Sequence, residues 1–179
     1  MPPGLQERLT ATWRQLESVS DRIRELRAPR LTRSANLSPE TSRALTQLLT
    51  VRAIGPIGAS VLATEIFGWR QIRNGRELGA LVGLVPAPYQ SGETDHDQGI
   101  SRAGNAHVRR VIVQLAWGWT RHQPNSALTR WYQQRFAGGG KRLRKIGIVA
   151  LARKLLIALW RYLETGVMPD GAQLKPVEV

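Results

Sequence analysis

The sequence predicts an all-α protein, in which a coiled-coil-like helical arm precedes a helical domain that carries one long functional loop. Three observations lead to this fold class: apolar residues recur at three- and four-residue spacing, helix start and stop signals divide the chain, and no segment is convincingly typical of a sheet. The chain has 179 residues and 42% hydrophobic residues, enough for a real core. We expect the arm and its linker at residues 1–36 and the main domain at residues 37–179.

The arm is predicted from a run of apolar or semi-apolar residues at heptad-like spacing, with charged residues between them. This pattern gives an amphipathic helix of about six turns. Only about two and a half heptads are present, so the arm could be a short coiled coil, fold onto the domain, or pair with a helix that is missing. Pro29 and the segment 30–36 break the pattern and are interpreted as a linker. The run comprises Leu9, Thr12, Leu16, Val19, Ile23 and Leu26.

The main domain is expected to begin with two helices joined by a glycine-rich corner. Ser38-Pro39-Glu40 is typical of a helix start, and this helix should run to about Thr50. A hinge over residues 51–59 then leads into an apolar helix over residues 59–67.

Gly55 and Gly58 in this hinge resemble the turn of a helix-hairpin-helix motif. Glycines let a backbone approach a phosphate, and free N–H groups at the next helix start bind the anion. A plain corner between two helices fits the same residues equally well.

Four further helices are predicted from caps and apolar stripes. Residues 83–89 should be mostly extended because Pro86 and Pro88 remove N–H donors, and residues 90–99 are expected to form the long polar loop. The helices are expected from Asn74 to Val82, from Gly104-Asn105 to about Pro124, over residues 127–137, and from about Arg142 to Glu164 with Gly166 at the end.

Composition excludes several classes of protein. The chain has no Cys, which removes disulfide frameworks, zinc knuckles, iron–sulfur clusters and cysteine nucleophiles. Its start lacks the apolar run of a signal peptide, and its longest apolar stretch, residues 146–160, is interrupted by Arg153 and Lys154. We therefore expect a cytoplasmic location and no membrane span.

The charge is concentrated in one part of the chain and points to nucleic acid. Residues 1–100 have a net charge of +2, whereas residues 101–165 carry 13 basic side chains against the single acid Glu164. Basic side chains at this density repel one another unless a polyanion neutralises them. The 22 Arg against 4 Lys could instead reflect a GC-rich genome, but such a bias should enrich both halves.

The loop over residues 90–99 is the first candidate for chemistry. Ser91 could be a nucleophile, with His96 as its base and Arg102 holding a phosphate oxygen, although a lone serine most often only shapes a turn. Glu93, Asp95, His96 and Asp97 could alternatively ligate a divalent metal, but their spacing gives no recognised ligand geometry.

The second candidate is a basic surface suited to gripping a nucleic-acid backbone without reading its sequence. It comprises Arg102, Arg109, Arg110 and the run from Lys141 and Arg142 to Lys145. Tryptophans could stack on bases, but those within apolar helices are more readily explained by core packing: Trp117, Trp119, Trp131 and Trp160.

Several motifs occur here in an order that resembles a known family. They are residues 53–59, Glu65-Ile66, residues 80–86, Gln90-Ser91-Gly92, and residues 99–105 followed by Val108-Arg109. This order resembles the C-terminal half of the DEDD-type insertion-sequence transposases of the "insertion sequence one-ten" family, over roughly residues 48–115 in motif detail.

The resemblance implies a DNA strand-exchange enzyme. In that family an N-terminal RuvC-like domain with an acidic Mg²⁺ site precedes a coiled coil and this helical domain, and the reaction is guided by a structured RNA. Ser91 matches the catalytic serine, which attacks a DNA phosphodiester. Arg102, Gly104, Asn105 and Arg109 fall in the motif that positions the phosphate backbone, and the arm implies a homo-oligomer.

The sequence also departs from the family. The sequence begins at the arm, and we expect an acidic domain to be missing, no cofactor bound by this chain and no cleavage by it alone, as for a truncated or decayed reading frame or a fragment that acts only with a complete partner. The residues after Ser91 are acidic, where many relatives are basic. Two alternatives stay open: a non-catalytic helix-hairpin-helix nucleic-acid-binding module, and an assembly protein whose basic helices meet an acidic protein.

Overall fold

The computed structural model describes residues 4–32, 37–91 and 94–176, and the side chains of these residues except 26–32 and 87–98. The chain divides into two compact units, Met1–Leu37 and Ser38–Val179. We describe each unit by itself.

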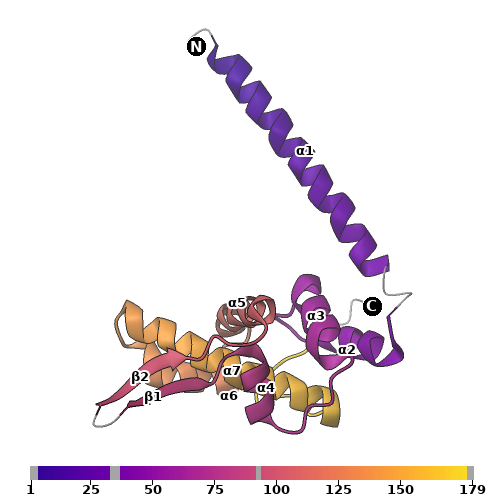
Figure 1. Cartoon of the computed structure of the whole chain (residues 1–179). Coiled ribbons are helices and arrows are strands. Elements are labelled where there is room, and N and C mark those ends of the chain that lie inside the picture. The colour runs from indigo at the N-terminus through magenta and orange to yellow at the C-terminus, as the bar shows by residue number, and fades with distance from the viewer. Residues whose placement is uncertain (1–3, 33–36, 92–93, 177–179) are drawn as a thin grey trace. The chain divides into compact units, whose positions relative to one another are not determined.

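The first unit is one long helix, α1, which spans Leu5–Thr32 (Figure 1). Apolar residues of this helix are exposed to solvent: Leu9, Trp13 and Leu16 are each more than half exposed. The expected break at Pro29 was wrong, since the helix continues to Thr32. A proline removes one backbone N–H donor and is disfavoured inside a helix, but α1 is helical on both sides of Pro29.

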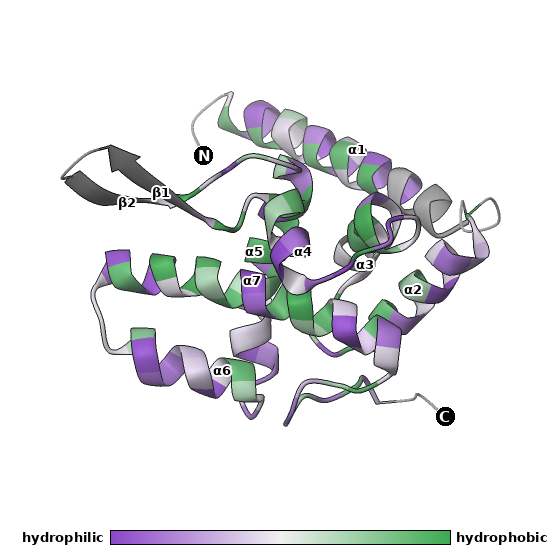
Figure 2. Cartoon of the chain, turned by 60° about the horizontal axis from the view of Figure 1, so that its bottom comes forward, coloured by the Kyte–Doolittle hydropathy of each residue, from purple (hydrophilic) through white to green (hydrophobic). Residues whose placement is uncertain are grey.

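The second unit is mainly helical, as the sequence predicts. Its longest helix, α7, contacts α2, α4, α5, α6 and η3. Hydrophobic and hydrophilic residues alternate along these helices, as expected for helices that cover a shared core (Figure 2). The helices are α2 (Pro39–Leu49), α3 (Pro56–Leu62), η2 (Ala63–Phe67), α4 (Gly75–Val82), α5 (Ala106–His122), α6 (Ala127–Tyr132), η3 (Gln133–Ala137) and α7 (Lys141–Thr165).

Helix boundaries follow the predicted caps closely. The Ser38 side chain accepts a hydrogen bond from the Thr41 N–H at the start of α2, and Gly166 ends α7 with a positive φ of 74°. The helix after the first corner begins at Pro56 rather than at residue 59, because a proline fits the first helical position. It continues directly into η2, a short π-helix.

The core of this unit is aliphatic with one large aromatic residue at its centre. Trp119 is fully buried, and its indole N–H donates to Ser126 Oγ at 2.8 Å. The prediction of core packing was wrong for Trp117, which is 48% exposed. The largest fully buried aliphatic side chains are Leu48, Ile54, Leu62, Ile66, Leu78, Ile112, Ile148, Leu151, Leu155, Leu156 and Leu159.

Within the segment 90–99, residues 90–91 and 94–99 lie in strands, which corrects the expectation of one long loop. Strands β1 (Pro86–Ser91) and β2 (Thr94–Ile100) form an antiparallel hairpin, with Ser91 opposite Thr94. The register is irregular between Pro86 and Pro88. The hairpin extends away from the helices (Figure 1). Neither of its faces has to pack on the core, so its sequence lacks the alternation of apolar and polar residues that predicts a strand.

The C-terminal tail is fastened to the corner between α2 and α3. The buried Gln123 donates from Nε2 to the carbonyls of Arg52 and Gln173, and its Oε1 accepts from the Gln173 N–H. Lys175 Nζ donates to the carbonyls of Leu49 and Ile54 at 2.5 and 2.9 Å. The tail therefore satisfies carbonyls at the end of α2.

Among the described residues, no helix combines the length and the apolar character that crossing a bilayer requires.

Candidate functional site

The base of the β-hairpin is fixed by backbone hydrogen bonds between the segments on either side of it. The N–H of Ser101 donates to the carbonyl of Val85 at 2.8 Å, and the N–H of Asn105 donates to that of Leu81 at 2.8 Å. The segment 101–105 therefore lies along the segment 81–85. We call these two segments the junction.

Two glycines make this close approach possible. Gly104 has a φ of +96°, and a Cβ built on it would overlap the Leu81 carbonyl oxygen. Gly83 has a φ of +69°, and a Cβ there would overlap the Ala103 carbonyl oxygen. Both positions need glycine for backbone conformation and for space.

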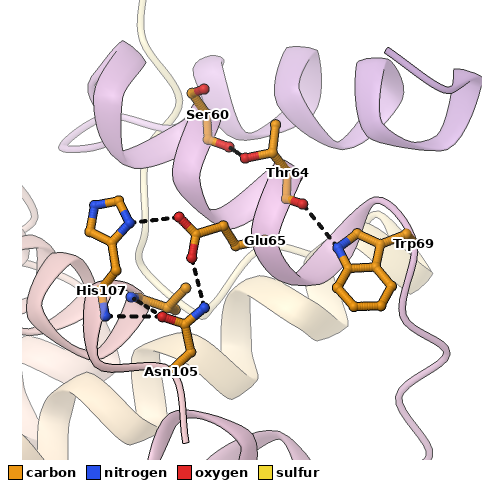
Figure 3. Close-up of polar contacts among 7 residues, drawn as sticks. Ser60, Thr64, Glu65, Trp69, Asn105 and His107 are labelled. Carbon is orange, nitrogen blue, oxygen red and sulfur yellow. Dashed lines mark hydrogen bonds and ion pairs between the residues drawn. The ribbon is translucent and has the colours of Figure 1, made fainter.

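Asn105 connects the junction to helix α5 and to η2. Its side-chain oxygen accepts from the N–H groups of His107 and Val108, which caps α5. Its side-chain nitrogen donates to Glu65 Oε2 at 2.7 Å, while His107 Nδ1 lies 2.6 Å from Glu65 Oε1. Figure 3 shows the Glu65 carboxylate between the two side chains.

The three arginines predicted to bind phosphate differ in their surroundings. Arg109 is half-buried, and its Nη1 donates to the Val82 carbonyl at 2.8 Å, which satisfies an acceptor at the end of α4. Arg110 and Arg102 are exposed, and Arg102 has a φ of +54°. Part of the guanidinium of Arg109 is therefore engaged within the fold.

Ser91 is the last residue of β1, at the end of the hairpin remote from the junction. Its side chain lies outside the described residues, as do those of Asp95, His96 and Asp97. The structure thus places the backbone of the predicted nucleophile on a hairpin whose base is fixed.

The two glycines of the predicted helix-hairpin-helix corner have different environments. Gly55 is the exposed N-cap of α3, and a Cβ there would meet no atom within 4 Å. Gly58 is buried, and a Cβ there would lie 3.0 Å from Leu115 of α5. Gly58 therefore allows α3 to pack closely on α5.

The basic run at the start of α7 is fully available to solvent. Lys141, Arg142, Arg144 and Lys145 are exposed, and none of them forms an ion pair with another described residue. Their charge is uncompensated locally and suits a polyanion.

No three His, Asp or Glu side chains among the described residues gather into one group. Glu65 has a single histidine beside it and an amide donor on its other oxygen. A donating amide is not a metal ligand, so this pair is better suited to orienting His107.

Sequence reasoning assigned no function to Glu65 or Arg70, and it named Trp69 only as one of six tryptophans that could stack on bases. Glu65, Arg70 and Asn105 line a cleft of 420 Å³ formed by η2, α4 and the start of α5. The signal for Glu65 was its place in the motif Glu65-Ile66, but its partners lie 40 and 42 residues further along the chain.

The family comparison covers the same elements. Residues 45–133 match the family model described as "Transposase IS116/IS110/IS902 family". This segment runs from α2 to the end of α6 and includes the junction and the hairpin. A helical domain with this motif order is a domain of insertion-sequence transposases.

The chain carries a transposase domain that belongs to the IS116/IS110/IS902 family. It is 47% identical over 143 residues to "Putative transposase y4rJ" of Sinorhizobium fredii, covering 79% of this chain and 36% of that protein. It is 32% identical over 152 residues to "Probable family 20 transposase" of Pseudomonas aeruginosa, covering 83% and 44%.

A third relative is "Transposase for insertion sequence element IS1328" of Yersinia enterocolitica, which is 34% identical over 116 residues, covering 65% of this chain and 33% of the relative. The chain spans less than half the length of each of these three relatives. The comparisons confirm the resemblance to insertion-sequence transposases, while the RuvC-like domain and the guide RNA stay predictions.

Proposed function

We propose that this chain is the part of an IS110-family transposase that binds DNA and supplies a serine nucleophile, Ser91. The observation that carries the proposal is the family match over residues 45–133, because the matched segment contains both Ser91 and the junction. A fixed hairpin base limits the positions that Ser91 can take, which favours attack on a bound phosphodiester.

The proposed step is an exchange of phosphate ester bonds. A bond forms between Ser91 Oγ and phosphorus, the bond from phosphorus to one sugar oxygen breaks, and the serine proton ends on the freed sugar hydroxyl. Attack by a sugar hydroxyl of another strand then releases Ser91. The number of ester bonds is unchanged, so the exchange needs no external energy source.

The proposed step calls for Mg²⁺, and no group of three potential metal ligands is found among the described residues. We propose that an acidic RuvC-like domain provides it and that the chain without such a domain forms no adduct. A structured guide RNA is the proposed second nucleic-acid partner. Bound Mg²⁺ would stabilise charge that develops on the phosphate.

The grip on DNA is proposed to come from exposed basic residues. Lys141 and Arg142 at the start of α7, with Arg102 and Arg110 near the start of α5, are open to solvent. Gly55 adds an open backbone position where a phosphate could approach. Contacts of this kind hold the backbone without reading bases.

The arm is proposed to pair with the arm of a second copy. Its apolar residues lie on the outside of α1, and the exposed fraction is 52% for Leu9, 56% for Leu16 and 44% for Ile23. These three residues are spaced by seven, as the seam of a coiled coil requires.

The test is formation of a covalent protein–DNA adduct. The chain is mixed with a complete RuvC-like domain of a relative, Mg²⁺ and end-labelled duplex DNA, and adducts are resolved on a denaturing gel. We expect an adduct that Ser91→Ala abolishes while DNA affinity stays within about twofold. Ser42→Ala on α2 is the matched control and should keep the adduct.

Three results would contradict the proposal. An adduct that persists in Ser91→Ala assigns the nucleophile to another residue. Salt-sensitive DNA binding without an adduct in any complete mixture favours the non-catalytic binding module. Affinity that does not change between about 50 and 200 mM salt contradicts binding through phosphates and favours the assembly protein.

A further inference from the structure

Trp69 is a large aromatic side chain that is displayed at the surface and yet held in place. It is 62% exposed, and its indole N–H donates to the Thr64 carbonyl at 2.9 Å. Figure 3 shows it leaving the end of η2 on the side away from His107 and Asn105. Because the hydrogen bond sets its orientation, the ring presents a flat apolar surface without support from the core.

A cation covers part of this ring. The guanidinium carbon of Arg70 lies 4.4 Å from the ring centroid, within cation–π distance. No described carboxylate pairs with Arg70. Its charge therefore stays available beside the aromatic surface, and it also lines the 420 Å³ cleft that reaches Asn105.

The segment around Trp69 is locally basic although the first hundred residues are nearly neutral. Residues 68–76 contain Arg70, Arg73 and Arg76 and no acid. All three are exposed, and none has an ion-pair partner in the part of the chain that the structure describes. The next acid, Glu77, accepts a hydrogen bond from the Arg73 N–H.

We propose that the segment 68–76 binds an unpaired nucleotide, with its base stacked on Trp69 and the neighbouring phosphates held by Arg70, Arg73 and Arg76. An exposed ring flanked by cations is the combination that single-strand-binding surfaces use. A base inside a duplex cannot stack on the ring, because both its faces are covered by neighbouring base pairs. The surface therefore distinguishes unpaired from paired nucleic acid.

This inference rests on the proposed function, which supplies the nucleic acid. It adds a second nucleic-acid-binding surface, outside the basic C-terminal part of the chain. A protein partner is disfavoured, because one ring among three uncompensated arginines is not a broad apolar patch. Unpaired DNA and unpaired RNA share the chemistry, and the experiment separates them.

The experiment measures the affinity of the full chain for three labelled probes of one sequence: a 12-nucleotide DNA strand, the same strand as RNA, and the blunt DNA duplex. Trp69→Ala should weaken binding to at least one single strand by about 5- to 150-fold, the range for one stacked base. Binding to the duplex should change by less than about twofold. The single strand with the larger loss identifies the source of the nucleotide.

Trp13→Ala is the matched control, because Trp13 is 61% exposed and its indole N–H donates to Glu17 at 2.8 Å. It should leave binding to the single strands unchanged. Trp69→Phe should restore most of the affinity, since phenylalanine also stacks, and helical circular dichroism should be the same for all variants.

The inference is overturned if Trp69→Ala leaves both single strands unaffected, or weakens duplex and single strands equally. Its failure is distinguishable from failure of the proposed function. A chain that stacks single strands through Trp69 but forms no Ser91 adduct contradicts the serine chemistry alone. An adduct without Trp69-dependent binding contradicts this inference alone.

Discussion

Two regions are rich in basic residues but use them differently. One is the junction together with the start of α5, and the other is the start of α7. At the junction, Arg109 donates to the Val82 carbonyl, and Asn105 is committed to capping α5 and to Glu65. At the start of α7, Lys141 and Arg142 are exposed and have no ion-pair partner among the described residues.

This difference shows that a basic motif has two separable contributions. Part of the charge holds the chain together by satisfying carbonyls and carboxylates, and part remains for a partner. Charge density along the sequence cannot separate the two, because it does not report which groups each cation reaches. Mutations should separate them, with large stability effects at the junction and binding effects at α7.

The largest expected effect is that of Gly104→Ala on stability. A Cβ at this position would overlap the Leu81 carbonyl oxygen and would hold an alanine at a φ of +96°. We expect the free energy of unfolding, measured by urea denaturation, to fall by about 3 kcal/mol. Gly138→Ala is the control, since a Cβ there meets no atom within 4 Å and the backbone is helical. Equal stabilities for the two variants would show that the junction is not rigid.

A medium effect is expected from comparing the neighbouring arginines of α5. Arg109→Ala removes a charged donor from the carbonyl of the buried residue Val82, so the free energy of unfolding should fall by about 1 to 2 kcal/mol. Arg110→Ala should change it by less than about 0.5 kcal/mol, because Arg110 is exposed. If both variants lost the same stability, the division between structural and available charge would not hold at this helix.

The smallest stability effect is expected at α7, where the change should instead appear in binding. The double variant Lys141→Ala, Arg142→Ala should unfold within about 0.5 kcal/mol of the original chain. The slope of log affinity against log salt for duplex DNA should fall by about 2, one for each lost phosphate contact. The double variant Arg22→Ala, Arg24→Ala removes the same charge from the arm and should keep the slope. Equal slopes for both double variants would place the DNA elsewhere.

The helices were predictable because their signals are local. Ser38, Asn74 and Asn105 each cap the helix that follows within three residues, and Gly166 ends α7 as expected. The hairpin was not predictable from apolar alternation, because it extends from the helices instead of covering a core. Glu65 was not assigned a role because its contacts to Asn105 and His107 cross 40 and 42 residues.

There is a different reason why Trp69 was not singled out. The sequence named all six tryptophans as possible stacking surfaces and favoured core packing for the four within apolar helices, which Trp119 confirms and Trp117 does not. Whether an aromatic ring is exposed depends on where the preceding helix ends. Here η2 ends at Phe67, two residues before Trp69. Averaging charge over the first hundred residues also concealed the three arginines between residues 70 and 76.

The fastened tail has a consequence for synthesis on the ribosome. Lys175 reaches the carbonyl of Ile54 across 121 residues of sequence. At usual elongation rates that interval takes roughly 6 to 24 s. During this time the carbonyls at the corner lack the ammonium group that will cover them. The corner between α2 and α3 is thus completed well after its own residues have been made.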